Sequence, residues 1–238
     1  MRSEAEMFAL ILKVAKNLPE VLAVGMNGSR TNKNAPKDDF QDYDIVYVVK
    51  NKEKLIQDKS WLQEFGEILV SQEPEKGELF PKSLGERYTF LMQFQDGNRI
   101  DLMLCPLSEV DHWLKEDKLI EILADPYDIL PETLPASDED YWVTRPNEQM
   151  VQDSWNEFWW VATYVVKGIC RQELFYASDH FYENCRGELL RMLSFKVGVM
   201  THFSLSVGKN YKYINKYIDE DLWNRLLSTY RMDSYENI

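Results

Sequence analysis

The chain has 238 residues, of which 45% are hydrophobic, so it can form one large domain or two smaller ones around a proper core. Its net charge of −13 is opposite to the balance typical of nucleic-acid binders, and no apolar run approaches the roughly 20 residues of a membrane span. The three cysteines lack CxxC spacing, which predicts reduced thiols in a cytoplasmic protein, with Cys170 and Cys185 buried. We expect no nucleic-acid or membrane partner, and a monomer is the favoured state.

Helical and strand patterns alternate in the first part of the chain. Ser3 and Glu6 form a capping box, so we expect a helix over residues 4–17. Apolar runs that predict strands lie at 20–27, 43–49, 88–94 and 99–105. The last two flank Asp96-Gly97, which predicts a hairpin turn. Helical spacing predicts further helices at 60–70 and 108–125.

A segment with three prolines and several acids, residues 125–142, predicts a connector. From about residue 147 onward the patterns are helical, including those at 183–200 and 220–230. The outline is therefore an α+β fold: a domain with a sheet and flanking helices over 1–135, then an all-helical domain over 136–238.

Two acids stand where the strand at 43–49 begins. Asp42 and Asp44 are two residues apart, so on an extended backbone their side chains point the same way. Neighbouring carboxylates repel each other unless a cation joins them, and Mg²⁺ is commonly held by one or two carboxylates plus substrate phosphates. Two such ions would clamp the attacking and leaving oxygens of a nucleotidyl transfer; one metal and two metals both stay open.

A third carboxylate and a glycine-serine pair complete this candidate site. Asp101 interrupts an apolar strand, where a lone acid is costly, and the hairpin would bring it toward the first two acids as a metal ligand or general base. Gly28 allows close approach of the backbone to a phosphate, Ser29 offers a hydroxyl, and Arg30 adds positive charge. A solvated acidic loop would explain Asp38 and Asp39, but it explains Asp44 poorly and Asp101 not at all.

The pattern of Gly-Ser, then Asp-x-Asp and a later third Asp resembles the DNA polymerase β-like nucleotidyltransferase superfamily. The resemblance narrows to the aminoglycoside 6-adenylyltransferases, also called streptomycin adenylyltransferases, and covers nearly the whole chain. The segments that carry it are GSRTNKNAPKDDFQDYDI, ELFP, DEDYW, NEFWWVATYVVKGICR, ELLRM and SLSVGKNYKYI.

This resemblance implies a mixed-sheet nucleotidyltransferase domain followed by a helical substrate-binding domain. It also implies transfer of AMP from Mg-ATP to the 6-hydroxyl of streptomycin, with release of pyrophosphate. Gly28 and Ser29 would hold the triphosphate, while Asp42, Asp44 and Asp101 would bind Mg²⁺, with Asp101 also a candidate base. Because family members continue for several more helices, we expect part of the helical domain to lie outside these 238 residues.

Candidates in the second domain depend on what the reaction needs. Pyrophosphate leaves with negative charge, so a lysine should stabilise it; Lys167 is favoured and Lys209 is next. Trp155 and its neighbours Trp159 and Trp160 would stack on adenine or a guanidinium group, although core packing is expected for at least two of the three. The acids Asp179 and Glu183 share a helical face and would contact a cationic drug; the alternative is an acidic surface with no ligand.

Two other functions remain open on sequence alone. A nucleotidyltransferase of the same fold would act on RNA or protein hydroxyls, although the acidic composition disfavours RNA. A catalytically inactive nucleotide-binding module would lack one of the carboxylates, and none is missing. The net charge of −13 favours a cationic aminoglycoside as the partner.

Overall fold

The computed structural model describes residues 1–79 and 82–238, and its contacts divide the chain into two compact units, Met1–Asp140 and Tyr141–Ile238. The domain boundary expected at residues 135 and 136 stays a prediction. Phe80 and Pro81, which end the ELFP motif, lie outside the described residues.

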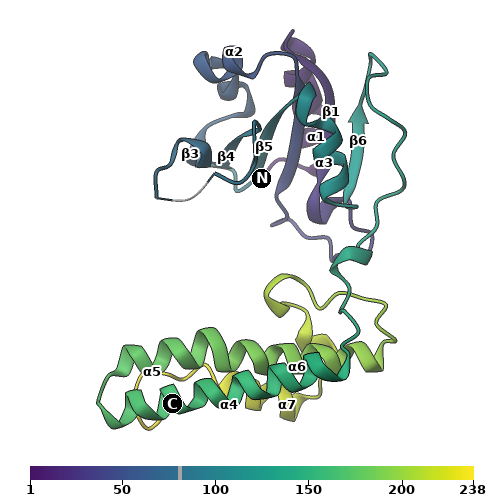
Figure 1. Ribbon diagram of the computed structural model, residues 1–238. Helices are drawn as coiled ribbons and strands as arrows, with labels where there is room; N and C mark the ends of the chain where they lie inside the picture. Colours follow the sequence, from purple (N-terminus) through teal and green to yellow (C-terminus); the bar gives the residue numbers. More distant parts are fainter. Residues whose placement is uncertain (80–81) are drawn as a thin grey trace. The chain divides into compact units, whose positions relative to one another are not determined.

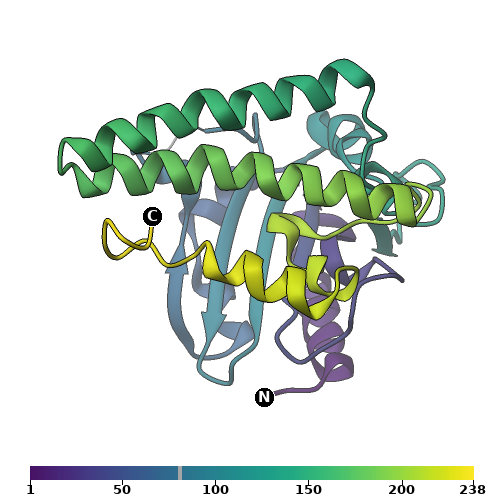
Figure 2. The same ribbon diagram turned by 90° about the horizontal axis from the view of Figure 1, so that it is seen from below.

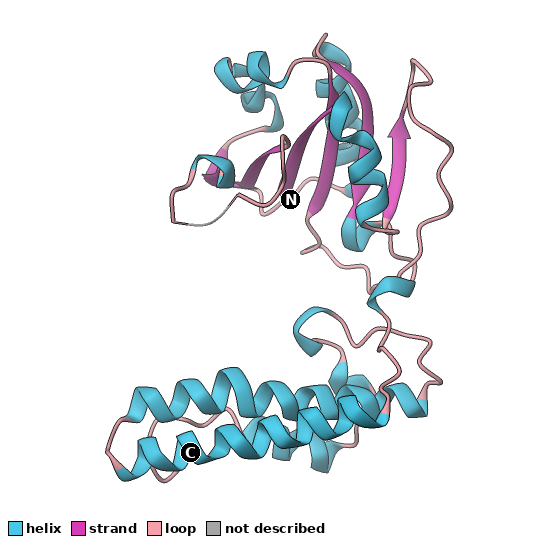
Figure 3. Ribbon diagram, in the orientation of Figure 1, coloured by secondary structure: helices cyan, strands magenta, loops and turns pink. Residues whose placement is uncertain are grey.

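The first unit is built around a six-stranded mixed sheet in the order β3-β4-β5-β2-β1-β6 (Figures 1 and 3). Its strands are β1 Val21–Asn27, β2 Tyr43–Val49, β3 Ile68–Gln72, β4 Tyr88–Phe94, β5 Arg99–Pro106 and β6 Ile120–Ala124. The neighbours β2 and β5 are parallel, and every other pair is antiparallel. The expected mixed sheet is confirmed, as is the hairpin, in which Gly97 has a positive φ of 88°.

One face of the sheet carries the larger core. The capping box at Ser3 is present, and it starts α1 Glu4–Asn17 at the expected residue. This helix packs on the sheet together with α2 Lys52–Gln57 and the 3-10 turn η2 Ser60–Phe65. Alternate residues of the two central strands point into this core, among them Tyr47 and Leu102, which are fully buried.

The opposite face is covered by the short helix α3 Val110–Glu116, which follows the turn η4 Leu107–Glu109. Trp113 of α3 lies against β1, where a Cβ at Gly25 would be 2.4 Å from the indole, and its Nε1 donates to Oδ1 of Asn27 at 2.9 Å. The smaller core on this face includes Val46, Val48 and Cys105 from the later halves of β2 and β5. The beginnings of these strands lie outside it, so polar side chains there stay within reach of a ligand.

Two helix predictions are wrong in part. The segment expected to be helical over 60–70 is a 3-10 turn only to Phe65, because Gly66 adopts a positive φ of 116° and the chain continues into β3. The segment expected to be helical over 108–125 ends its helix at Glu116. The Asp117 side chain then accepts from the N–H of Leu119 at 2.8 Å, and the apolar residues that follow pair with β1 as β6. Strand pairing across the chain overrides the local pattern in both places.

The second unit is helical, as expected. The long helices α4 Glu148–Cys170 and α6 Arg186–Met200 lie side by side (Figure 2) and are joined through α5 Leu174–His180 and the π-helical turn η6 Phe181–Cys185. The last helix of the described residues is α7 Glu220–Ser228. Shorter 3-10 turns are η1 Gly28–Arg30, η3 Pro74–Lys76, η5 Glu139–Tyr141, η7 Lys209–Tyr211 and η8 Ile214–Lys216. None of the described helices combines the length and apolar character needed to cross a membrane.

Candidate active site

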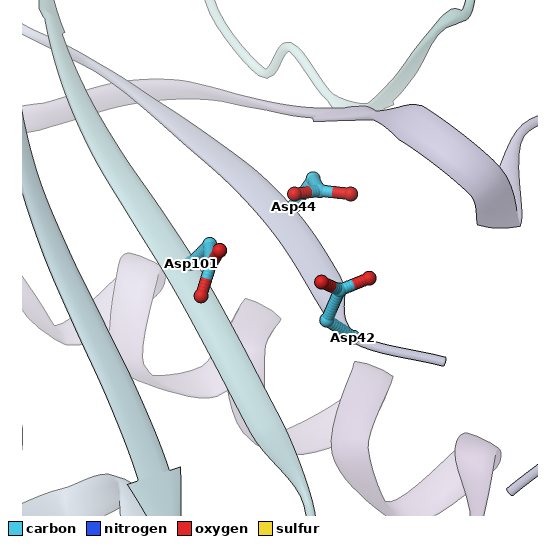
Figure 4. A group of neighbouring side chains, drawn as sticks. All are labelled: Asp42, Asp44 and Asp101. Atoms are coloured by element: carbon cyan, nitrogen blue, oxygen red, sulfur yellow. The ribbon is translucent and has the colours of Figure 1, made fainter. Parts of the chain in front are cut away.

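Three carboxylates meet where β2 and β5 begin, outside the smaller core of this sheet face. Parallel pairing places Asp44 of β2 directly beside Asp101 of β5, and Asp42 precedes β2 by one residue, so all three side chains lie on the same side (Figure 4). One oxygen from each lies within 4.8 Å of the others, and each residue is partly buried. The expectation that the hairpin brings Asp101 to the other two acids is therefore met by the strand register.

Arg30 fixes the entrance to β2. Its Nε donates to the carbonyl of Asp42 at 2.9 Å and its Nη2 to the carbonyl of Gln41 at 2.7 Å. The guanidinium also lies 3.7 Å from the centre of the Tyr43 ring and pairs with Glu4 at 3.0 Å. Only 8% of its side chain is exposed, so the role that these contacts support is positioning the backbone that carries Asp42. A direct contact of Arg30 with a nucleotide stays a prediction.

Gly28 provides space beside Asp44. Its φ is +76°, and a Cβ at this position would lie 2.1 Å from Oδ2 of Asp44, so no other residue fits without moving the carboxylate. Its N–H donates to the carbonyl of Leu119 at 3.1 Å. The next residue, Ser29, accepts from the amide of Gln41 at 3.2 Å through its hydroxyl, which donates to no acceptor among the described residues. This hydroxyl therefore retains a proton that a phosphate oxygen would accept.

Arg99 is a residue of this site that sequence reasoning missed. Its Nε donates to Oδ1 of Asp101 at 2.8 Å and its Nη2 donates to Oδ2 at 2.7 Å. The two residues therefore form a bidentate ion pair. These hydrogen bonds, with smaller contributions from the charges of Asp101, Asp42 and Asp44, raise the pKa of Arg99. The signal was present in the sequence, since Arg99 precedes Asp101 by two residues on a strand and so shares its face.

The other predicted residues belong to the second unit. Lys167, on α4, places its ammonium 4.9 Å from the ring centre of Tyr164 and 5.5 Å from that of Tyr176. Lys209 is exposed in η7, and Asp179 and Glu183 are exposed where α5 passes into η6. Their proposed contacts with ATP or a cationic substrate stay predictions.

The expected burial of the tryptophans on α4 is wrong. The exposed fractions are 57% for Trp155, 54% for Trp159 and 64% for Trp160, because the buried stripe of the helix instead comprises Ser154, Val161, Val165 and Gly168. The rings of Trp155 and Trp159 meet edge to face at 5.8 Å. Cys170 is also exposed, contrary to expectation, whereas Cys105 and Cys185 are buried and no disulfide forms.

Comparison with known proteins shows the family to which the chain belongs. A family model described as streptomycin adenylyltransferase matches residues 1–238. The chain belongs to this family. An aminoglycoside 6-adenylyltransferase of Campylobacter jejuni is 44% identical over 238 residues, which are 100% of this chain and 82% of the relative. An aminoglycoside 6-adenylyltransferase of Staphylococcus aureus is 41% identical over 236 residues, 99% of this chain and 84% of that one.

An aminoglycoside 6-adenylyltransferase of Bacillus subtilis (strain 168) is 40% identical over 239 residues, which cover 100% of this chain and 84% of the relative. A crystal structure of an aminoglycoside 6-adenyltransferase from Bacillus subtilis aligns with 100% of this chain and 84% of its own, at 35% identity and a TM-score of 0.47. The family resemblance stated from the sequence motifs is confirmed, and the protein is an enzyme of the nucleotidyltransferase class.

The chemistry of Asp42, Asp44 and Asp101 fits the binding of a magnesium ion. All three donors are oxygens, the type of ligand that Mg²⁺ prefers, and they come from the paired strands β2 and β5 and from the residue that precedes β2. Three negative charges within 4.8 Å also repel one another, and a divalent cation removes that repulsion. The residues present therefore fit the ion that nucleotidyltransferases generally use with ATP.

Proposed function

We propose that this protein is an aminoglycoside 6-adenylyltransferase that transfers AMP from Mg-ATP to the 6-hydroxyl of streptomycin and releases pyrophosphate. The family membership and three relatives named aminoglycoside 6-adenylyltransferase support the proposal. The observation that carries it is the convergence of Asp42, Asp44 and Asp101 beside the Gly28-Ser29 turn.

Each carboxylate would have a role in the transfer. Asp42, Asp44 and Asp101 would hold Mg²⁺, which when bound offsets the charge of the phosphate oxygens. The hydroxyl oxygen of the drug forms a bond to the α-phosphorus, and the bond from that phosphorus to the bridging oxygen of the β-phosphate breaks. Asp101 would accept the hydroxyl proton, since it lies on the same sheet face as the other two acids.

Other residues would bind the two substrates. Ser29 would donate to a phosphate oxygen, with Gly28 leaving room for Asp44 and Arg30 holding the strand entrance. Lys167 and Lys209 would contribute positive charge toward the triphosphate. Asp179, Glu183 and Trp155 would contact the cationic drug, in keeping with a net charge of −13.

One assay tests the proposal: pyrophosphate release from ATP in the presence of Mg²⁺, with streptomycin, other aminoglycosides or RNA as the acceptor. We expect turnover with streptomycin and AMP attached at its 6-hydroxyl, identified by mass spectrometry and NMR. Turnover with RNA alone would show the other nucleotidyltransferase function, and no turnover with any acceptor would indicate an inactive nucleotide-binding module.

A matched pair of variants connects the activity to the site. Asp44→Asn should abolish AMP transfer with the fold intact, because a neutral amide removes one charge from the metal ligands. Asp39→Asn is the control, since Asp39 is an exposed acid of the preceding loop and loses the same charge. Normal turnover by Asp44→Asn, or equal loss in both variants, would contradict the assigned metal site.

A further inference from the structure

Arg99 and Asp101 form an ion pair inside the proposed metal site. Both guanidinium contacts, at 2.8 and 2.7 Å, go to the same carboxylate, one to each of its oxygens. Asp101 lies directly beside Asp44 in the parallel register, so this pair stands next to the other two acids. Arg99 is thus a cation already bound to one of the groups that a divalent metal would use.

The sum of the formal charges shows how Arg99 affects the binding of a metal at the three carboxylates. Three carboxylates carry −3, and Arg99 reduces the total to −2. A single divalent ion would neutralise that remainder, but it would also be repelled by a guanidinium bound to the same carboxylate. The metal and Arg99 therefore compete for Asp101.

Arg99 is held much less firmly than the other arginine beside the site. Arg30 donates to three different residues, stacks on Tyr43 and has 8% of its side chain exposed. By contrast, 46% of the Arg99 side chain is exposed, and among the residues that the structure describes it donates only to Asp101. If Asp101 binds a metal, no other hydrogen-bond acceptor among the described residues holds the guanidinium in place.

We propose that Arg99 is an exchangeable counter-ion: it neutralises Asp101 in the empty site and moves to the phosphates of ATP when a divalent cation takes the carboxylates. The inference rests on the proposed function and adds a phosphate-binding residue to it. The guanidinium fork that fits a carboxylate also fits two phosphate oxygens, so the same donors serve both states. In the second state Arg99 would stabilise the charge that develops on the leaving pyrophosphate.

The first experiment measures metal binding without nucleotide. Mn²⁺ is titrated into wild type, Arg99→Ala and a charge control, and free Mn²⁺ is followed by electron paramagnetic resonance. We expect Arg99→Ala to bind Mn²⁺ roughly three- to tenfold more tightly, because a competing two-pronged ion pair is removed. The control is Lys13→Ala, an exposed residue of α1 on the opposite face of the sheet, and its affinity should match wild type.

The second experiment measures nucleotide use by the same proteins. Arg99→Ala should raise the KM for ATP at least about tenfold and lower kcat/KM about a hundredfold, since a bidentate phosphate contact is lost. Arg99→Lys retains the charge without the fork, so it should recover part of the loss. Because Arg99 is half exposed, thermal unfolding of both variants should stay close to that of wild type.

The outcomes separate three possibilities. Unchanged or weaker Mn²⁺ binding in Arg99→Ala would overturn the exchange, because it would show that Arg99 only orients Asp101. Tighter Mn²⁺ binding with unaltered kinetics for ATP would overturn its transfer to phosphate. If wild type transferred AMP to no acceptor, the proposed function would fail, whereas the Mn²⁺ comparison would still decide whether Arg99 competes with the metal.

Discussion

Gly28→Ala would add a methyl group where Asp44 approaches the backbone. The new Cβ would lie 2.1 Å from Oδ2 of Asp44, whereas real Cβ atoms essentially never come within 3.0 Å of such a neighbour, so the oxygen would retreat by about 0.9 Å. Metal sites tolerate deviations of only about 0.2 Å, and a misplacement of about 1 Å in an active site costs on the order of a hundredfold in rate. We therefore expect AMP transfer to fall at least about a hundredfold and Mn²⁺ affinity to fall with it.

The same substitution also carries a backbone cost. Gly28 has a φ of +76°, where a residue with a Cβ is disfavoured by roughly 1–2 kcal/mol, partly offset by the lower entropy of the unfolded chain. A net loss of about 1 kcal/mol corresponds to a Tm lower by roughly 2–4 °C, so the variant should remain folded at assay temperature. Loss of activity then reports the displaced carboxylate rather than unfolding.

The assay compares Gly28→Ala with Gly187→Ala. Gly187 lies in α6, where a Cβ would meet nothing within 4 Å, and alanine there should be neutral or stabilising by up to about 1 kcal/mol. Pyrophosphate release, Mn²⁺ titration and thermal unfolding are measured for both variants and wild type. Transfer by Gly28→Ala within twofold of wild type would refute the reasoning, because it would mean that Asp44 need not occupy its present position.

Further predictions concern a catalytic acid, a surface ion pair and the thiols. Asp101→Asn should lower kcat at least about a hundredfold while changing the KM for ATP less than about threefold, and the reverse pattern would remove Asp101 as the base. Hydrogen bonds from Arg2, followed by those from Asn98, hold the pKa of Asp96 well below its ordinary value of 3.8. The stability that they confer is present above pH 3.8 and is lost as the pH falls below it. Urea unfolding should therefore show Asp96→Asn less stable than wild type by about 1–2 kcal/mol at pH 7 and by a smaller amount at pH 2.5, and an equal difference at both pH values would contradict this assignment. Of the three thiols, Cys170 is exposed, whereas burial raises the pKa of Cys105 to about 12 and also raises the pKa of Cys185. Ellman's reagent should therefore modify one thiol quickly in the native protein and all three after unfolding. Rapid modification of more than one thiol in the native protein would argue against the burial of Cys105 and Cys185.

Local patterns succeeded where the physical signal is local. The capping box at Ser3 starts α1 because its hydrogen bonds involve residues three apart, and Asp96-Gly97 turns the hairpin because glycine accepts a positive φ. The same reasoning failed after Glu116, where an apolar run that also suits a helix pairs with β1 instead. It failed for Trp159 as well, because size and apolar character do not reveal which side of a helix faces the core.

By itself the sequence determined the chemistry available to this protein: carboxylates at Asp42, Asp44 and Asp101, a Gly28-Ser29 turn before them, and motifs of one enzyme family. Only the tertiary structure decided that β2 and β5 are parallel neighbours in a register that sets Asp44 beside Asp101, and that Arg99 holds the latter. The physical reason is that hydrogen bonds between strands join residues 57 positions apart, and such pairing depends on the packing of the whole sheet rather than on either strand alone.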